Sequence, residues 1–149
     1  MLKYLIRTGD DISMLILRII LGCVFFPHGA QKLLGWFAGY GFSGTIGFFT
    51  KTMHISYPLA VIEIITEFFA PIALIFGFFT RAASMGIGVI MIVAIAMVHW
   101  RYGFFMNWSG TQHGEGIEYH LLVLAITAVL MIKGAGRWSV DRLISKHLS

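Results

Sequence analysis

Four long apolar runs, separated by two connections rich in glycine and aromatic residues, dominate the pattern of this sequence. The runs cover residues 12–32, 57–80, 81–100 and 117–133. A helix that crosses the hydrocarbon core of a bilayer, about 30 Å thick, needs about 20 mostly apolar residues. The pattern therefore predicts an all-α fold, a bundle of four transmembrane helices in one domain that covers residues 1–149.

The two connections, residues 33–56 and 101–116, are expected at the membrane–water interface, where aromatic side chains concentrate. Within the first connection, residues 45–54 have the composition of a short helix that lies on the membrane surface. After the fourth run, a serine that can cap a helix is followed by Asp141 in the first turn. This pattern predicts a short cytoplasmic tail helix over residues 139–147.

An even number of spans places both ends of the chain on one side of the membrane. Basic residues in the membrane-flanking segments are divided seven to three between the two sides. The larger group is Lys3, Arg7, Arg81, Lys133, Arg137, Arg142 and Lys146, and the smaller is Lys32, Lys51 and Arg101. Because Lys and Arg accumulate in cytoplasmic segments, both termini are predicted to be cytoplasmic and both connections to face outward.

Composition supports a membrane protein and excludes several other classes. Hydrophobic residues make up 58% of the chain, charged residues 12%, and the mean hydropathy is +0.82, which excludes a soluble globular domain. Cys23 is the only cysteine, which excludes a paired-cysteine disulfide exchanger and a cysteine-ligated iron–sulfur cluster within one chain. No basic block suggests nucleic-acid binding. The first run lacks a signal-peptide cleavage site and is expected to stay as an anchor.

Two carboxylates in the second apolar run are the strongest candidates for chemistry. Glu63 and Glu67 are four residues apart, so a helix directs both to one side. Counted from Tyr57, they lie about 9 Å and about 15 Å deep. Because a carboxylate at such depth costs about 2.5–3.5 kcal/mol, both must face the protein interior and hold a proton or meet a cation.

Arg18 is the third candidate catalytic residue, because it lies inside the first apolar run and cannot lose its proton. Glu67 is the nearest acid in depth. One interpretation is a buried Arg18–Glu67 bridge that fixes helix packing, with Glu63 as a surplus carboxyl group available as a proton site. The alternative is that the carboxylates are only structural.

The residues that could line a cofactor pocket near the outer ends of the helices are His28, Lys32, Trp36, His99, Glu118, Tyr119 and His120. Of these, the three histidines, Glu118 and Tyr119 are expected at about one depth, together with Glu63. Each histidine taken singly fits an interfacial hydrogen-bonding role better than a role as a ligand. No two histidines have the i, i+4 spacing of a helical metal pair, so no metal site is predicted, although haem, or copper on Met97, Met106 or His113, stays open.

Four stretches together resemble the DoxX family of small bacterial membrane proteins: LRIILGCVFFPHGAQKLLGWFAGYGF, FGFFTRAA, GEGIEYHLLVL and GAGRWSVD. The resemblance covers nearly the whole chain and implies a four-helix domain of the inner membrane. The family takes its name from a subunit linked to quinone-dependent oxidation of sulfur compounds, and members are often described as oxidoreductases or their subunits. The shared motifs contain His28, Gly29, Lys32, Leu33, Gly35, Trp36, Phe37, Glu67, Thr80, Arg81, Glu118, Tyr119, Ser139 and Asp141.

Three functions fit these observations. The first is a quinone-linked oxidoreductase subunit, with His28, Lys32 or His120 donating to the quinone carbonyls and the two glutamates relaying protons. It needs a membrane or soluble redox partner, because the chain contains no recognisable redox-cofactor motif. The second is a non-catalytic binding or assembly protein that holds a lipid, a small amphiphile or a partner subunit. The third is a proton-coupled transporter, which at four spans requires a second copy of the chain.

Overall fold

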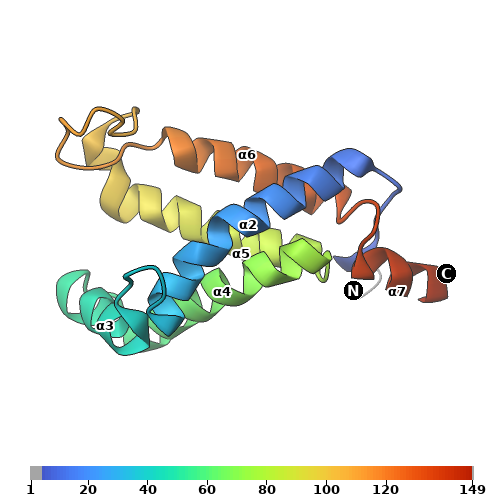
Figure 1. The fold of residues 1–149 in the computed structure, drawn as a ribbon, viewed down its shortest axis with the longest axis horizontal. Coiled ribbons are helices and arrows are strands. Elements are labelled where there is room, and N and C mark those ends of the chain that lie inside the picture. The colour runs from blue at the N-terminus through green and yellow to red at the C-terminus, as the bar shows by residue number, and fades with distance from the viewer. Residues whose placement is uncertain (1–4, 149) are drawn as a thin grey trace.

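The computed structural model describes residues 5–148, in which all regular secondary structure is helical and there is no β-strand (Figure 1). The all-α prediction is confirmed. Lys3, counted above among the basic residues near the termini, lies outside the described residues. The α-helices are α2 Ile12–Leu34, α3 Gly41–Gly47, α4 Tyr57–Phe76, α5 Thr80–Ala94, α6 Glu118–Lys133 and α7 Val140–Leu148.

Within the described residues, three helices are long and apolar enough to cross a membrane. They are α2, α4 and the segment Thr80–Tyr102, in which α5 continues through a π-helical turn, Ile95–His99, and a short 3-10 turn, Trp100–Tyr102. Helix α6, with 16 residues, is shorter. Large apolar side chains such as Ile16, Ile20 and Ile132 are exposed on the outside of the helices, as expected in a lipid environment.

Two glycines let α2 and α4 pack backbone against backbone. A Cβ atom at Gly29 would lie 2.3 Å from the carbonyl oxygen of Glu67, and one at Gly22 would lie 2.8 Å from that of Pro71. Neither contact is possible for a residue with a side chain, so only glycine permits this approach. The contact sets the register of the two helices and places the end of α2 beside the carboxylates of α4.

The turn between α4 and α5 differs from the predicted boundary near Thr80. Helix α4 ends at Phe76 because Gly77 adopts a left-handed conformation with φ of 65°. The first N–H groups of α5 then bond to the tail: Asp141 Oδ1 accepts from Phe79 N at 2.7 Å, and Oδ2 accepts from Thr80 N at 2.9 Å. The carboxylate of Asp141 therefore caps α5, a role usually filled by a local residue.

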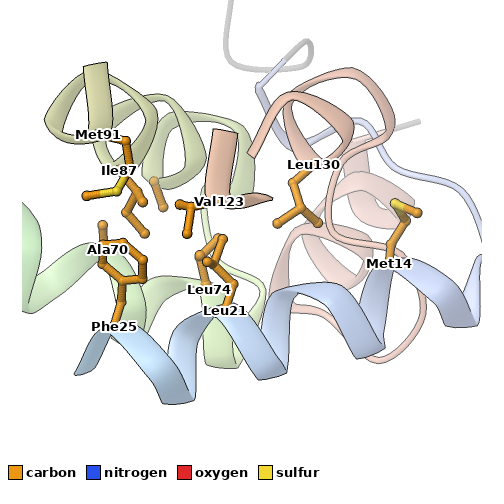
Figure 2. Packing of buried hydrophobic residues seen from close by; sticks show 10 residues of the cluster. Met14, Leu21, Phe25, Ala70, Leu74, Ile87, Met91, Val123 and Leu130 are labelled. Atoms are coloured by element: carbon orange, nitrogen blue, oxygen red, sulfur yellow. The ribbon is translucent and has the colours of Figure 1, made fainter. Parts of the chain in front are cut away.

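Buried apolar side chains from α2, α4, α5 and α6 meet in one core, and Figure 2 shows them pointing toward one another. They are Met14, Leu21, Phe25, Ala70, Leu74, Ala83, Ile87, Met91, Val123 and Leu130. Helix α7 lies at the end of this assembly where α4 and α6 finish, while α3 and the connection 103–117 lie at the opposite end (Figure 1). The polar side chains considered below are divided between these two ends.

Candidate functional site

A lysine and two glutamates form an ion cluster between α2 and α4. Lys32 Nζ contacts both Glu63 Oε1 and Glu67 Oε2. The exposed fraction of the side chain is 28% for Lys32, 20% for Glu63 and 6% for Glu67. Lys32 and Glu63 are therefore partly open to the surroundings, whereas Glu67 is buried. We call Lys32, Glu63 and Glu67 the acid triad. Fully ionised, it carries one positive and two negative charges, a net charge of −1.

The surface segment between α2 and α4 covers the acid triad. The hydroxyl of Thr45, on α3, donates to the carbonyl oxygen of Lys32 at 3.2 Å. The π-helical turn Phe48–Thr52 places the buried ring of Phe49 with its centroid 5.3 Å from Lys32 Nζ, within the range of a cation–π contact. Residues 45–54, expected as one short surface helix, instead form the end of α3 and the π-helical turn, and this segment lies over the ammonium group of Lys32.

Two histidines meet on the neighbouring pair of helices. The ring centroids of His99, at the end of the π-helical turn, and His120, on α6, are 4.1 Å apart. His99 Nδ1 lies 2.8 Å from the carbonyl oxygen of Glu115. Nδ1 of His120 is buried and has no hydrogen-bond partner among residues 5–148. The imidazole of His120 also interacts with the backbone of Gly116, and a ring nitrogen without a partner can donate to or accept from a bound group.

Tyr119 lies between the histidine pair and the acid triad. Its ring stacks on Phe25 with centroids 6.4 Å apart, and it packs edge-on against His120 at 5.7 Å. The phenol is close enough to Glu67 for the two to interact electrostatically. Its buried hydroxyl has no hydrogen-bond partner within the described part of the chain. The structure thus brings Glu63, Glu67, Lys32, Tyr119, His99 and His120 into one region.

The other candidate cofactor residues lie at the margin of this region. His28 is exposed, and its ring lies 6.1 Å from that of Phe25. Trp36 is 53% exposed and packs edge-on against Phe26. Glu118 Oε1 accepts from Met106 N and from Trp108 Nε1, both at 2.9 Å. Glu118 therefore holds the connection 103–117 in place.

The interpretation of Arg18 as the partner of Glu67 is wrong, because Glu67 binds Lys32 and Arg18 binds backbone carbonyls at the other end of the helices. Its guanidinium donates to the carbonyl oxygens of Leu74 at 3.0 Å, Ala135 at 3.0 Å and Trp138 at 2.6 Å. It also donates to those of Ile75 and Arg137. A buried guanidinium needs several acceptors, and the end of a helix supplies free carbonyls.

Arg18 and Asp141 together attach the tail to the helices. Arg18 interacts electrostatically with Asp141, whose N–H donates to the carbonyl oxygen of Gly77 at 2.9 Å. Burial raises the pKa of the Asp141 carboxyl, against the opposing effect of the N–H donors at Thr80 and Phe79. The sequence placed Asp141 in a shared motif but gave no sign of this role, since its partners are backbone groups.

Among residues 5–148, no three His, Cys, Asp or Glu side chains come together as a group that could hold a metal ion. The residues Met97, Met106 and His113, considered above for copper, therefore have no cluster of such ligands around them. In the acid triad, the cation that pairs with the carboxylates is the ammonium group of Lys32 and not a metal ion.

Comparisons with known proteins agree with the motifs in the sequence. The model of the DoxX family matches residues 13–100. A protein of Haemophilus influenzae described as uncharacterized is 29% identical over 140 residues, which is 93% of this chain and 87% of the relative. "Inner membrane protein YqjF" of Escherichia coli is 26% identical over 92% of this chain and 95% of its own length. "Putative oxidoreductase CatD" of Bacillus subtilis is 28% identical over 91% and 90%. No solved structure matches the chain.

Proposed function

This chain belongs to the DoxX family of inner-membrane proteins, and we propose that it is a subunit of a quinone-linked oxidoreductase in which the acid triad exchanges a proton within the membrane. The observation that carries the proposal is the charge of the triad. One ammonium group balances one of the two carboxylates, and Glu63 Oε2 is buried without a hydrogen-bond partner among the described residues. A single proton on this carboxyl makes the triad neutral.

The reduction of a quinone to a quinol consumes two electrons and two protons, so a quinone site inside a membrane needs an acid nearby. The triad would meet this need by passing the two protons one after the other, taking up a new proton at Glu63 after the first transfer, because Lys32 stabilises the form that has lost its proton. Its edge at Lys32 and Glu63 is partly exposed, whereas Glu67 is buried. A proton can therefore enter at Glu63 and pass inward to Glu67.

The polar groups around the triad fit a quinone. A quinone carbonyl oxygen accepts hydrogen bonds, and the hydroxyl of Tyr119 and Nδ1 of His120 are buried groups with no partner within residues 5–148. The stacked ring of Phe25 offers an aromatic surface beside them. A bound quinone would supply the electron-transfer chemistry, and a membrane or soluble partner would supply the electrons. The name of the Bacillus subtilis relative supports an oxidoreductase.

The proposed topology has four spans, with α6 as the fourth and both termini in the cytoplasm. Helix α6 is about 24 Å long at about 1.5 Å per residue, and Glu118 and Lys133 at its ends can reach the interface. Leu122 and Ile132 are exposed on its surface. After Cys23→Ala, a cysteine placed at Trp108 should react with an impermeant reagent from outside, and one placed at Ser145 only after the membrane is opened. The reverse pattern would contradict this topology.

Quinone binding gives the direct test. An organic extract of the protein, solubilised in a mild detergent, should contain quinone. Protein from which this quinone has been removed should bind added ubiquinone-1. Tyr119→Phe removes one hydrogen-bond donor and should weaken ubiquinone-1 binding about 2- to 10-fold, while Tyr57→Phe, at an exposed tyrosine of α4, should leave it unchanged. An extract without quinone, together with no binding of ubiquinone-1, would overturn the redox proposal.

Proton exchange has its own test. Glu63→Gln leaves Lys32 and Glu67 as a neutral pair, so the protein should fold and bind ubiquinone-1, but proton uptake should become slower when a chemical reductant converts the bound quinone to the quinol. Unchanged proton uptake would show that the triad is structural. In that case a binding or assembly protein becomes the better reading, which the projecting Trp108, 87% exposed and held by Glu118, favours.

A further inference from the structure

A groove of about 650 Å³ lies between the end of α4 and helix α7, at the opposite end from the acid triad. Its apolar wall includes Phe76 and Leu143, both 63% exposed, and Trp138, 76% exposed. Two basic residues of α7, Arg142 and Lys146, complete the lining. They are four residues apart and so lie on one side of the helix. The groove thus combines an apolar surface with two cations.

The groove lies at the end of a candidate membrane helix, where that helix would meet the bilayer surface. Helix α4 is apolar and long enough to cross a membrane, and it ends at Phe76 in the groove wall. The last residue of a membrane helix lies close to the level of the lipid headgroups. An amphiphile in the adjacent leaflet would therefore meet Phe76 and Leu143 with its acyl chain and the α7 cations with its headgroup.

Hydrogen bonds to three different parts of the chain hold the walls of the groove in place. The carbonyl oxygen of Trp138 accepts from Arg18 at 2.6 Å, and Trp138 itself has a left-handed backbone with φ of 51°. The start of α7 is fixed by Asp141, which caps α5. Arg142 Nη1 donates to Asp10 Oδ1 at 2.7 Å, which orients its guanidinium. A surface formed in advance loses little conformational freedom when it binds a ligand.

We infer that this groove binds one anionic phospholipid of the adjacent leaflet, with the phosphate on Arg142 and Lys146 and an acyl chain along Phe76, Trp138 and Leu143. The charge of the surrounding surface favours an anionic headgroup. Lys133, at the end of α6, and Arg137 lie at the same end of the molecule as Arg142 and Lys146. The carboxylates at this end are fewer: Asp10 pairs with Arg137 and Arg142, Asp11 caps α2 and Asp141 caps α5. This site is separate from the proposed redox function and does not depend on it.

The inference is tested with the full chain in detergent by native mass spectrometry and thermal shift, with phosphatidylglycerol and phosphatidylcholine as probes. Phosphatidylglycerol should bind more tightly than phosphatidylcholine and raise the melting temperature more. Its affinity should fall as the salt concentration is increased. Lys146→Gln should lower its affinity about 5-fold, and Leu143→Ser/Lys146→Gln should lower it further. Lys51→Gln, which removes an exposed lysine at the opposite end, is the matched control and should have no effect.

Three outcomes would overturn the inference. The first is equal binding of the two lipids. The second is a Lys146→Gln affinity no weaker than that of Lys51→Gln. The third is a dimer in the wild type that Leu143→Ser dissociates, which would make the groove a contact between two copies. Because both groove positions are exposed, folding should be unaffected. A photoreactive phosphatidylglycerol on the wild type, with the cross-linked peptide expected in α7, provides a readout that needs no variant.

Discussion

Replacing Lys32 by methionine removes the one cation of the acid triad. Methionine keeps a flexible apolar side chain of similar length, so the packing against Phe49 is largely retained. The net charge of the triad with both carboxylates ionised changes from −1 to −2, and two carboxylates are left facing each other. The replacement therefore tests the electrostatic role of the lysine with little change in volume.

The expected cost is that of breaking a buried ion pair from one side, about 3–5 kcal/mol. The triad is buried enough for this value to apply, since Glu67 is 6% exposed and Glu63 20% exposed. For a chain of this size, each kcal/mol lowers the melting temperature by about 2–4 °C, so Lys32→Met should lower it by roughly 10 °C. Lys51→Met, at an exposed lysine on the covering segment, should change it little.

A triple replacement separates charge from packing. Lys32→Met/Glu63→Gln/Glu67→Gln removes every charge of the triad, and a buried ion pair replaced by uncharged groups often costs nothing. The melting temperature in detergent should therefore return close to that of the wild type. If the triple variant is no more stable than Lys32→Met alone, the lysine contributes through its packing and the electrostatic account of the triad is wrong.

Three further predictions concern helix approach, the tail and acid stability. Gly29→Ala should lower stability by at least about 1–3 kcal/mol, because its Cβ would meet the α4 backbone, whereas Gly47→Ala, with open space around it, should be neutral or stabilising; thermal unfolding of both checks this. Arg18→Lys should lose at least about 3 kcal/mol and speed hydrogen exchange in residues 140–148, because lysine cannot span five carbonyls; unchanged exchange would contradict it. Hydrogen bonds from Arg137 and Arg142 lower the pKa of Asp10 from 3.8 to about 2, so its contribution is present above about pH 3.8 and lost as pH falls to about 2. The difference in melting temperature between wild type and Asp10→Asn should accordingly shrink over that interval, and a difference independent of pH would disprove it.

The sequence was sufficient to predict the helical class and to place two acids in the interior. Apolar runs report directly on helices, and the four-residue spacing of Glu63 and Glu67 reports on one helix face. Depth counted from the helix ends also placed His99 and His120 at one level, and the structure brings their rings to 4.1 Å. The position of a residue can thus be predicted from the sequence when it depends only on distance along one helix.

The ionic partners were not predictable in the same way. The cation that pairs with Glu67 depends on the position of α2 along the axis of α4. That position is set by a backbone contact at Gly29, which no pattern of polar residues in the sequence indicates. Arg18 was harder still, because its acceptors are main-chain carbonyls, which every residue has. The turn at Gly77 could be suspected from glycine alone, but not the capping of α5 by Asp141, which is 61 residues from Thr80.

The bonds of Arg18 also impose an order on the biogenesis of the protein. The guanidinium belongs to α2, whereas three of its acceptors, at residues 135, 137 and 138, are translated more than a hundred residues later. During synthesis α2 therefore enters the insertion machinery with a charge that its final neighbours cannot yet neutralise, and lipid headgroups, water or the translocon must accommodate it until the tail emerges. Helix α2 therefore reaches its final position only after the acceptors at residues 135–138 have been synthesised.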